Sequence, residues 1–130
     1  AVWCGKAVQT FLESEASGLC VVARLPADIQ AYFGAKTTRV FLSSETRDSH
    51  KKHGWTAADF AHLQTVLDRG EVRADREHHV IAAHHDGVWW YAALKVTRDL
   101  KEVYLLSFRR SNNDQIARIR KRGRLVRSGF

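Results

Sequence analysis

Two hydrophobic periods divide this chain into a helical part and a part made of strands. Before Gly70, apolar residues recur every three or four positions, which is the spacing of amphipathic helices. The clearest case is Phe60, Leu63 and Leu67, which share one face of a helix that begins near Thr56. The same spacing predicts helices at residues 5–16, 26–34 and 56–69, and the polar segment 46–53 is expected to be a further helix. Two short apolar runs predict buried strands, at residues 19–23 and 39–42.

After Gly70 the period falls to two, which is the repeat of β-strands. The alternating runs predict four consecutive strands, at residues 71–73, 79–84, 88–97 and 102–108. A basic amphipathic helix, with Ile116 and Ile119 on its apolar face, is expected to close the chain at residues 114–122. Helices followed by an antiparallel meander predict an α+β domain, in which the N-terminal helices pack on one face of a four- to five-stranded antiparallel sheet.

The positive charge of the chain is concentrated at its C-terminal end. Residues 1–107 carry thirteen Lys or Arg and thirteen Asp or Glu, whereas residues 108–130 carry eight Lys or Arg and a single Asp. The formal net charge of +7 therefore comes from this last segment alone. Clustered cations bind polyanions by displacing condensed counterions, so nucleic acid is the expected partner. The residues expected to contact its backbone are Arg110, Arg118, Arg120, Lys121, Arg122 and Arg124.

Length and composition favour one globular domain, because the chain has 130 residues of which 45% are hydrophobic and 27% charged. We expect its core at about residues 19–110 and a basic tail at residues 111–130. No apolar run reaches the roughly 20 residues that cross a bilayer, so no membrane span is expected. Because the chain starts with Ala1 and contains no Met, we expect it to be part of a larger protein.

The cysteines and histidines do not combine into a recognisable metal site. Cys4 and Cys20 lack zinc-finger spacing and are expected as reduced thiols, with a Cys4–Cys20 disulfide as the alternative. In the pairs His78-His79 and His84-His85, neighbours on a strand point to opposite faces, and no Cys or carboxylate pattern completes a ligand set. His62 falls opposite the apolar face of its helix and is expected to be exposed. We therefore predict no metal and no other cofactor.

Candidate chemistry gathers on the non-core face of the predicted sheet. Alternation along residues 88–97 turns Trp90 to the core and turns Trp89 and Tyr91 to the other face, where either ring could stack on a base. If Thr97 pairs with Val103, the same face displays Lys95, Thr97, Ser107 and Arg109. An ammonium, a guanidinium and two hydroxyls can hold a phosphate and stabilise negative charge on it.

A proton-transfer group would complete such a site. Imidazole titrates near neutral pH, and His53 at the end of the helix at residues 46–53, or His50 one turn earlier, would supply it. The candidate catalytic residues also have ordinary structural explanations. His53 followed by Gly54 also fits a plain helix C-terminus, and Lys95 and Thr97 also fit a solvent-facing strand.

Five segments of the sequence together resemble a known protein family. They are VFLSSET at 40–46, KKHG at 51–54, VLDRGEV at 66–72, LKVT at 94–97 and YLLSFRR at 104–110. Over about residues 39–110 the chain resembles the phage-associated members of the barnase–EndoU–colicin–RelE-like nuclease superfamily. The resemblance implies an α+β fold and metal-independent cleavage of RNA, frequently tRNA, by attack of a ribose 2′-hydroxyl on the adjacent phosphate. The residues that it carries over as catalytic are His53, Lys95, Thr97, Ser107 and Arg109.

We therefore expect a metal-independent endoribonuclease, a toxin domain in which His53 or His50 draws the proton from the 2′-hydroxyl. Lys95 and Arg109 would stabilise the phosphorane, and Thr97 and Ser107 would orient its oxygens. A delivered toxin would act in the cytoplasm of a target cell and would meet an immunity protein or antitoxin; otherwise the domain would be bacterial cytoplasmic or phage-associated. The alternative is a non-catalytic nucleic-acid-binding or phage structural module that uses the basic tail.

Overall fold

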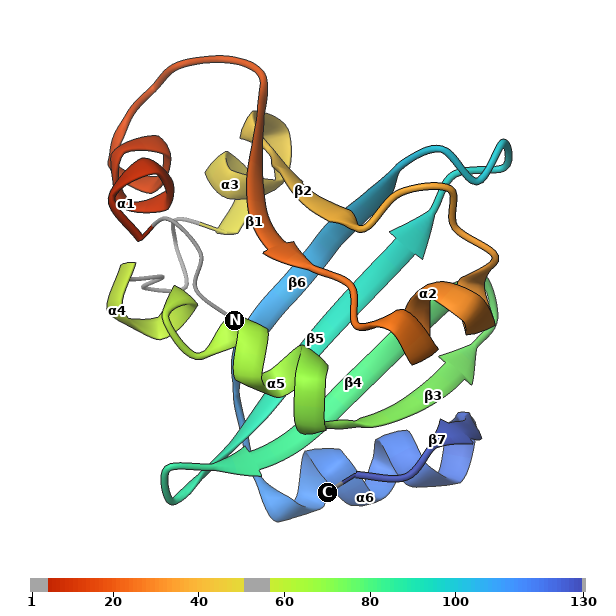
Figure 1. The fold of residues 1–130 in the computed structure, drawn as a ribbon. Helices are drawn as coiled ribbons and strands as arrows, with labels where there is room; N and C mark the ends of the chain where they lie inside the picture. The colour runs from red at the N-terminus through yellow and green to blue at the C-terminus, as the bar shows by residue number, and fades with distance from the viewer. Residues whose placement is uncertain (1–4, 51–56, 130) are drawn as a thin grey trace.

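The computed structural model describes residues 5–50 and 57–129, which form a seven-stranded sheet with helices on both faces (Figure 1). The helices are α1 (Gly5–Glu13), α2 (Ala27–Phe33), α3 (Ser44–His50), α4 (Ala57–Phe60), α5 (Leu63–Arg69) and α6 (Asn113–Arg122). The strands are β1 (Leu19–Arg24), β2 (Arg39–Ser43), β3 (Glu71–Asp75), β4 (His78–His85), β5 (Val88–Val96), β6 (Val103–Ser111) and β7 (Arg124–Arg127). Among the described residues, no helix combines the length and hydrophobicity that crossing a bilayer requires.

The sheet contains the predicted meander but is larger than predicted. Its strand order is β1-β2-β6-β5-β4-β3-β7, and β3 to β6 pair antiparallel in sequence order. The strand β2 lies parallel to β6 and brings the antiparallel β1 with it, while β7 pairs with β3 at the opposite edge. The α+β class is therefore confirmed, whereas the expected sheet of four to five strands is wrong because β1, β2 and β7 join it.

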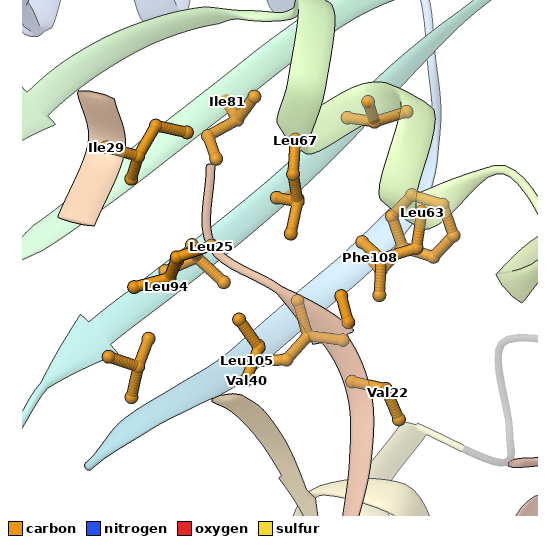
Figure 2. Close-up of a cluster of buried hydrophobic side chains, with 14 of the residues drawn as sticks. Val22, Leu25, Ile29, Val40, Leu63, Leu67, Ile81, Leu94, Leu105 and Phe108 are labelled. Carbon is orange, nitrogen blue, oxygen red and sulfur yellow. The ribbon is translucent and has the colours of Figure 1, made fainter. Parts of the chain in front are cut away.

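The main hydrophobic core lies on the face of the sheet covered by α2, α5 and β1, which we call the inner face (Figures 1 and 2). Leu94 of β5 and Leu105 of β6 are completely buried there. Leu63 and Leu67 of α5 meet them from the helix layer and are equally buried. Each such side chain contributes about 1.5–3 kcal/mol relative to an exposed one, so this layer dominates the stability of the domain.

A second, smaller core lies on the other side of the sheet, which we call the outer face. Ile116 and Ile119 of α6 pack there against Val80, Ala82 and Ala93. The two alanines on adjacent strands leave room for the helix to approach the sheet closely. The N-terminal helices pack on one face as expected, while the predicted C-terminal amphipathic helix buries its apolar stripe on the other face and so adds a second helical layer.

The register of the β5–β6 hairpin differs from the predicted one at its start. Val103 pairs with Val96 and not with Thr97. An extra residue, Leu106, then forms a β-bulge, and from Ser107 onward β6 follows the register that was predicted. The bulge is the physical reason for the difference, because two residues of β6 oppose one residue of β5 at this point.

The bulge also corrects the predicted division of β6 into two faces. Strict alternation would place Leu105 and Arg109 on the same side of the sheet. Instead, Leu105 belongs to the inner core, whereas Arg109 pairs with Tyr91 of the outer face. Arg110 follows on the inner face, opposite Trp90. Adjacent arginines on β6 consequently point to opposite faces of the sheet.

The helix predicted over residues 56–69 is divided in two. Ala61 and His62 donate backbone hydrogen bonds three residues back, which makes a tight turn between α4 and α5. Phe60 and Leu63 are nevertheless both fully buried, because the tighter turn keeps residues three apart on one side. Thr56, the predicted N-cap, lies outside the described residues.

Arg127 of β7 ties the end of the chain to the helix layer. Its side chain is 6% exposed and donates hydrogen bonds to the carbonyl oxygens of Leu67 at 2.7 Å and Gly70 at 2.6 Å. These carbonyls belong to the C-terminal end of α5, where backbone acceptors lack helical partners. The guanidinium also bonds Asp28 of α2 at 3.2 Å. One buried cation thus joins β7, α5 and α2.

We expect Arg127→Ala to lower the free energy of unfolding by at least about 2 kcal/mol, because each buried carbonyl left without a donor costs about 1–3 kcal/mol. Urea unfolding followed by circular dichroism measures the change. Arg124→Ala is the matched control, since Arg124 lies on the same strand and is exposed, and its effect should stay within about 0.5 kcal/mol. Equal losses in the two variants would contradict the assigned role of Arg127.

Candidate functional site

The two histidines predicted as catalytic bases lie at the end of α3 and beyond it. His53, with Lys51, Lys52 and Gly54, lies outside the described residues. His50 is half-buried in the last turn of α3, and its Nδ1 lies 2.9 Å from the carbonyl oxygen of Thr46. The Ser49 hydroxyl also lies 3.0 Å from the same nitrogen, so these contacts tie the ring to its own helix.

Lys95 and Thr97 lie at the end of β5, on the turn side of the bulge. Lys95 is exposed on the outer face and opposes Tyr104. The Thr97 hydroxyl donates to Asp99 at 2.6 Å and accepts from the backbone N–H of Glu102 at 3.1 Å. The hydrogen bond from Thr97 lowers the pKa of Asp99 and keeps it a carboxylate. Thr97 therefore organises the β5–β6 turn.

Ser107 and Arg109 share the outer face with Lys95 but lie farther along the hairpin. Arg109 opposes Tyr91, and its guanidinium carbon lies 4.5 Å from the centre of the Tyr91 ring. Lys95 is four residues beyond Tyr91 on β5, which corresponds to about 13 Å at about 3.3 Å per residue. The structure therefore places these predicted residues on one face, as expected, but groups Arg109 with α6 and not with Lys95.

A different cluster lies at the inner-face end of the central strands, beside the β4–β5 hairpin. The His62 ring stacks on the Trp90 ring with their centres 4.9 Å apart, and the His85 ring contacts His62 at 5.3 Å. Trp90 is 1% exposed, stacks on Phe108 at 5.3 Å and donates from Nε1 to the carbonyl oxygen of His85. The buried indole is thus a fixed platform that holds two half-buried imidazoles side by side.

Arg110 completes this cluster from β6. Its guanidinium carbon lies 5.4 Å from the Trp90 ring centre, and Nη2 bonds Asp59 of α4 at 3.2 Å. The Arg110 side chain is 63% exposed, so this ion pair is open to solvent and to exchange with another anion. Because β4, β5 and β6 are neighbours, His85 and Arg110 flank Trp90 from its two sides.

Sequence reasoning missed this cluster because His62 was expected to be exposed, and that expectation is wrong. The tight turn before α5 rotates His62 toward Trp90, and periodicity alone does not reveal such a turn. The position of His85 on the inner face could have been predicted from the sequence. Asp86 and Gly87 both have positive φ, so the two-residue turn pairs His85 with Val88, a residue already assigned to the core face.

A groove opens beside the imidazole pair, where β4 extends beyond the start of β3. It encloses about 320 Å³ between α5 and α6, and its lining includes Arg69, His84, His85, Trp89 and Arg120. Glu71 also borders it and bonds both Arg73 at 2.6 Å and Arg120 at 3.2 Å. Burial raises the pKa of Glu71, but the hydrogen bonds from these two arginines outweigh burial and leave the pKa below its usual range.

The predicted nucleic-acid-binding residues are held on a folded surface. Arg118, Lys121, Arg122 and Arg124 are exposed on α6 and at the start of β7, and Arg122 lies 3.7 Å from Asp75. Trp89 donates from Nε1 to Asn113 at 2.7 Å, and Trp89 and Tyr91 both pack against the second core. A guanidinium also lies over each ring, that of Arg109 at 4.5 Å from the Tyr91 centre and that of Arg120 at 5.5 Å from the Trp89 centre. The described residues include no group of three metal-ligating side chains.

No family model, curated protein or solved structure matches this chain. The described residues offer two candidate sites: an imidazole pair with an arginine on the inner face, and a cationic surface on the outer face.

The lowered pKa of Glu71 gives a testable pH dependence. A carboxyl whose pKa is depressed by folding stabilises the fold above its unfolded pKa, near 4.3, and loses this contribution as the pH falls. Wild type should therefore exceed Glu71→Gln in unfolding free energy at a pH of about 7, and the difference should shrink at a pH of about 3.5. Urea titrations at both values measure it. A difference that grows on acidification would contradict the assigned ion pairs.

Proposed function

We propose that this domain is a metal-independent endoribonuclease whose active site is the cluster of His62, His85 and Arg110. The observation that carries the proposal is the pair of half-buried imidazoles, 5.3 Å apart, held on a buried tryptophan beside an exposed arginine. Two imidazoles can divide proton transfer between a neutral ring and a protonated ring near neutral pH. Arg110 adds the positive charge that a phosphorane needs.

The proposed reaction is cleavage by the ribose 2′-hydroxyl of the substrate itself. One imidazole takes the proton of the 2′-hydroxyl as its oxygen bonds to the adjacent phosphorus. The other imidazole gives a proton to the departing 5′-oxygen as the P–O5′ bond breaks. The products are a 2′,3′-cyclic phosphate and a 5′-hydroxyl, so atoms and protons balance without water in this step. Arg110 would leave Asp59 to bind the non-bridging oxygens.

RNA is the proposed substrate for two reasons. The mechanism requires a 2′-hydroxyl, and the concentrated positive charge of residues 108–130 suits a polyanion. The sequence resemblance adds tRNA as the proposed class of RNA and a toxin as the proposed biological role, with an immunity protein or antitoxin as partner. His53, Lys95, Thr97, Ser107 and Arg109 remain proposed contributors from that resemblance, and His50 remains one from its position one turn before His53.

A non-catalytic nucleic-acid-binding module is the second candidate. The exposed cations of α6 favour it, because they bind a phosphate backbone whether or not any chemistry follows. Salt-sensitive RNA binding without product on long incubation would support this second function over the first.

We expect purified protein to cleave total tRNA in EDTA, and we expect His62→Gln and His85→Gln each to lower the rate about 10²–10⁴-fold, which is the usual contribution of a positioned acid or base. Gel electrophoresis of end-labelled tRNA measures cleavage. His78→Gln is the control: it makes the same change at the opposite end of β4 and should retain wild-type activity. Equal losses in His78→Gln and His85→Gln, or an absolute need for magnesium, would remove the proposed mechanism.

Arg110 should act mainly on the chemical step. We expect Arg110→Gln to lower kcat about 10²-fold, which is the size of effect seen when a donor to a developing oxyanion is removed. Arg110→Lys should recover part of the loss, because an ammonium keeps the charge but not the bidentate geometry. Arg98→Gln removes the same charge from the exposed β5–β6 turn and serves as control. A change confined to KM would make Arg110 a binding residue only.

A further inference from the structure

A small hollow on the outer face gathers three guanidinium groups away from the imidazole pair. It encloses about 170 Å³ between the hairpin and α6, and its lining comprises Tyr91, Arg109, Gln115, Arg118, Ile119 and Arg122. Arg109 comes from β6, while Arg118 and Arg122 are four residues apart on α6 and therefore share one side of the helix. Among the described residues that line this hollow there is no carboxylate.

Three like charges at one point are unfavourable unless an anion offsets them. Arginines at positions i and i+4 of a helix repel each other, and Arg109 adds a third charge from the sheet. The ion pair of Arg122 with Asp75 is long, at 3.7 Å, and reaches only one of the three. A bound anion would pair with all three guanidinium groups and offset the repulsion between them.

The hollow is held in place by the second core. Ile119 is 5% exposed and anchors α6 on the sheet between Arg118 and Arg122. The guanidinium of Arg109 lies against the Tyr91 ring, 4.5 Å from its centre, which fixes its plane. These contacts position the cations before any ligand arrives, so binding needs little further ordering of side chains.

Two neutral donors complete the lining. Burial raises the pKa of Tyr91, despite the opposing effect of Arg109 and Arg122, so its hydroxyl keeps a proton to donate. The side-chain oxygen of Gln115 accepts from the Ser111 hydroxyl at 2.7 Å, which leaves its amide NH₂ as the group to offer a ligand. Guanidinium, hydroxyl and amide donors together suit the oxygens of a phosphate group.

We propose that this hollow binds one backbone phosphate of an RNA strand, at a distance from the bond that is cut. The choice of RNA rests on the proposed function. Arg109 in the hollow and Arg110 in the imidazole cluster are consecutive residues of β6 on opposite faces. The strand β2 pairs with β6 only at Val103 and Tyr104 in the described part of the chain. In this proposal the bound strand passes this side of β6 and contacts both arginines.

Binding is measured separately from cleavage with a single-stranded 2′-O-methyl RNA oligonucleotide, which lacks the attacking hydroxyl. Fluorescence anisotropy across a potassium chloride series in EDTA gives the slope of log affinity against log salt. We expect Arg118→Gln/Arg122→Gln to reduce the slope by at least about 0.7, the contribution of one single-strand phosphate. Arg98→Gln/Lys101→Gln removes equal charge from the exposed β5–β6 turn and should change it much less. Equal slopes in the two double variants overturn the proposal.

Cleavage assays then locate the phosphate relative to the cut bond. With long RNA, Arg118→Gln/Arg122→Gln should raise KM several-fold and leave kcat unchanged, while cleavage of a dinucleotide should not change. A fall in kcat on the dinucleotide overturns the remote position. If wild type cleaves no RNA but the slopes differ as expected, the phosphate site is supported and the proposed nuclease function is rejected. If RNA is cleaved but the slopes are equal, the nuclease function is supported and the phosphate site is rejected.

Discussion

The β-bulge at Leu106 is the constraint on which the arrangement of both proposed sites depends. The sheet is buried on two faces, so β6 has to supply apolar side chains to each of them. Leu105 and Phe108 serve the inner core, and strict alternation cannot place residues three apart on one face. The extra residue resolves this conflict and turns Leu106 to the outer core. Arg109 and Arg110 then diverge to opposite faces as a direct consequence.

Packing of α6 changes the physical meaning of the basic C-terminal segment. A disordered cationic tail would bind a polyanion at the cost of ordering its own backbone. Here Ile116 and Ile119 attach the helix to the sheet, and Arg127 attaches the following strand to α5 and α2. The cations are therefore displayed on a surface that the fold has already ordered, and one of them, Arg127, is used for stability instead of display.

The aromatic stack of Phe108, Trp90 and His62 connects the main core to the inner-face cluster. Figure 1 shows α5 lying over the central strands of the sheet. Phe108 and Trp90 are buried with the core, whereas His62 is only half-buried at the end of the stack. A rigid, apolar platform restricts the rotamers of an imidazole that rests on it, which favours defined geometry in proton transfer. Stability and proposed chemistry thus share the same side chains.

Local sequence determined the α+β class, the strands of the meander and the amphipathic helix near the C-terminus. It also determined the concentration of positive charge there. Periodicity and charge are properties of residues close together in the chain, so the sequence alone reveals them. Tertiary structure alone decided the parallel pairing of β2 with β6, the addition of β7, the bulge at Leu106 and the approach of His62 to Trp90. Each of these depends on contacts between segments distant in sequence, where burial of two sheet faces outweighs local preference. The grouping of cations and imidazoles into two separate sites could therefore not be predicted from the sequence, although nearly all of the residues involved had been considered in the sequence analysis.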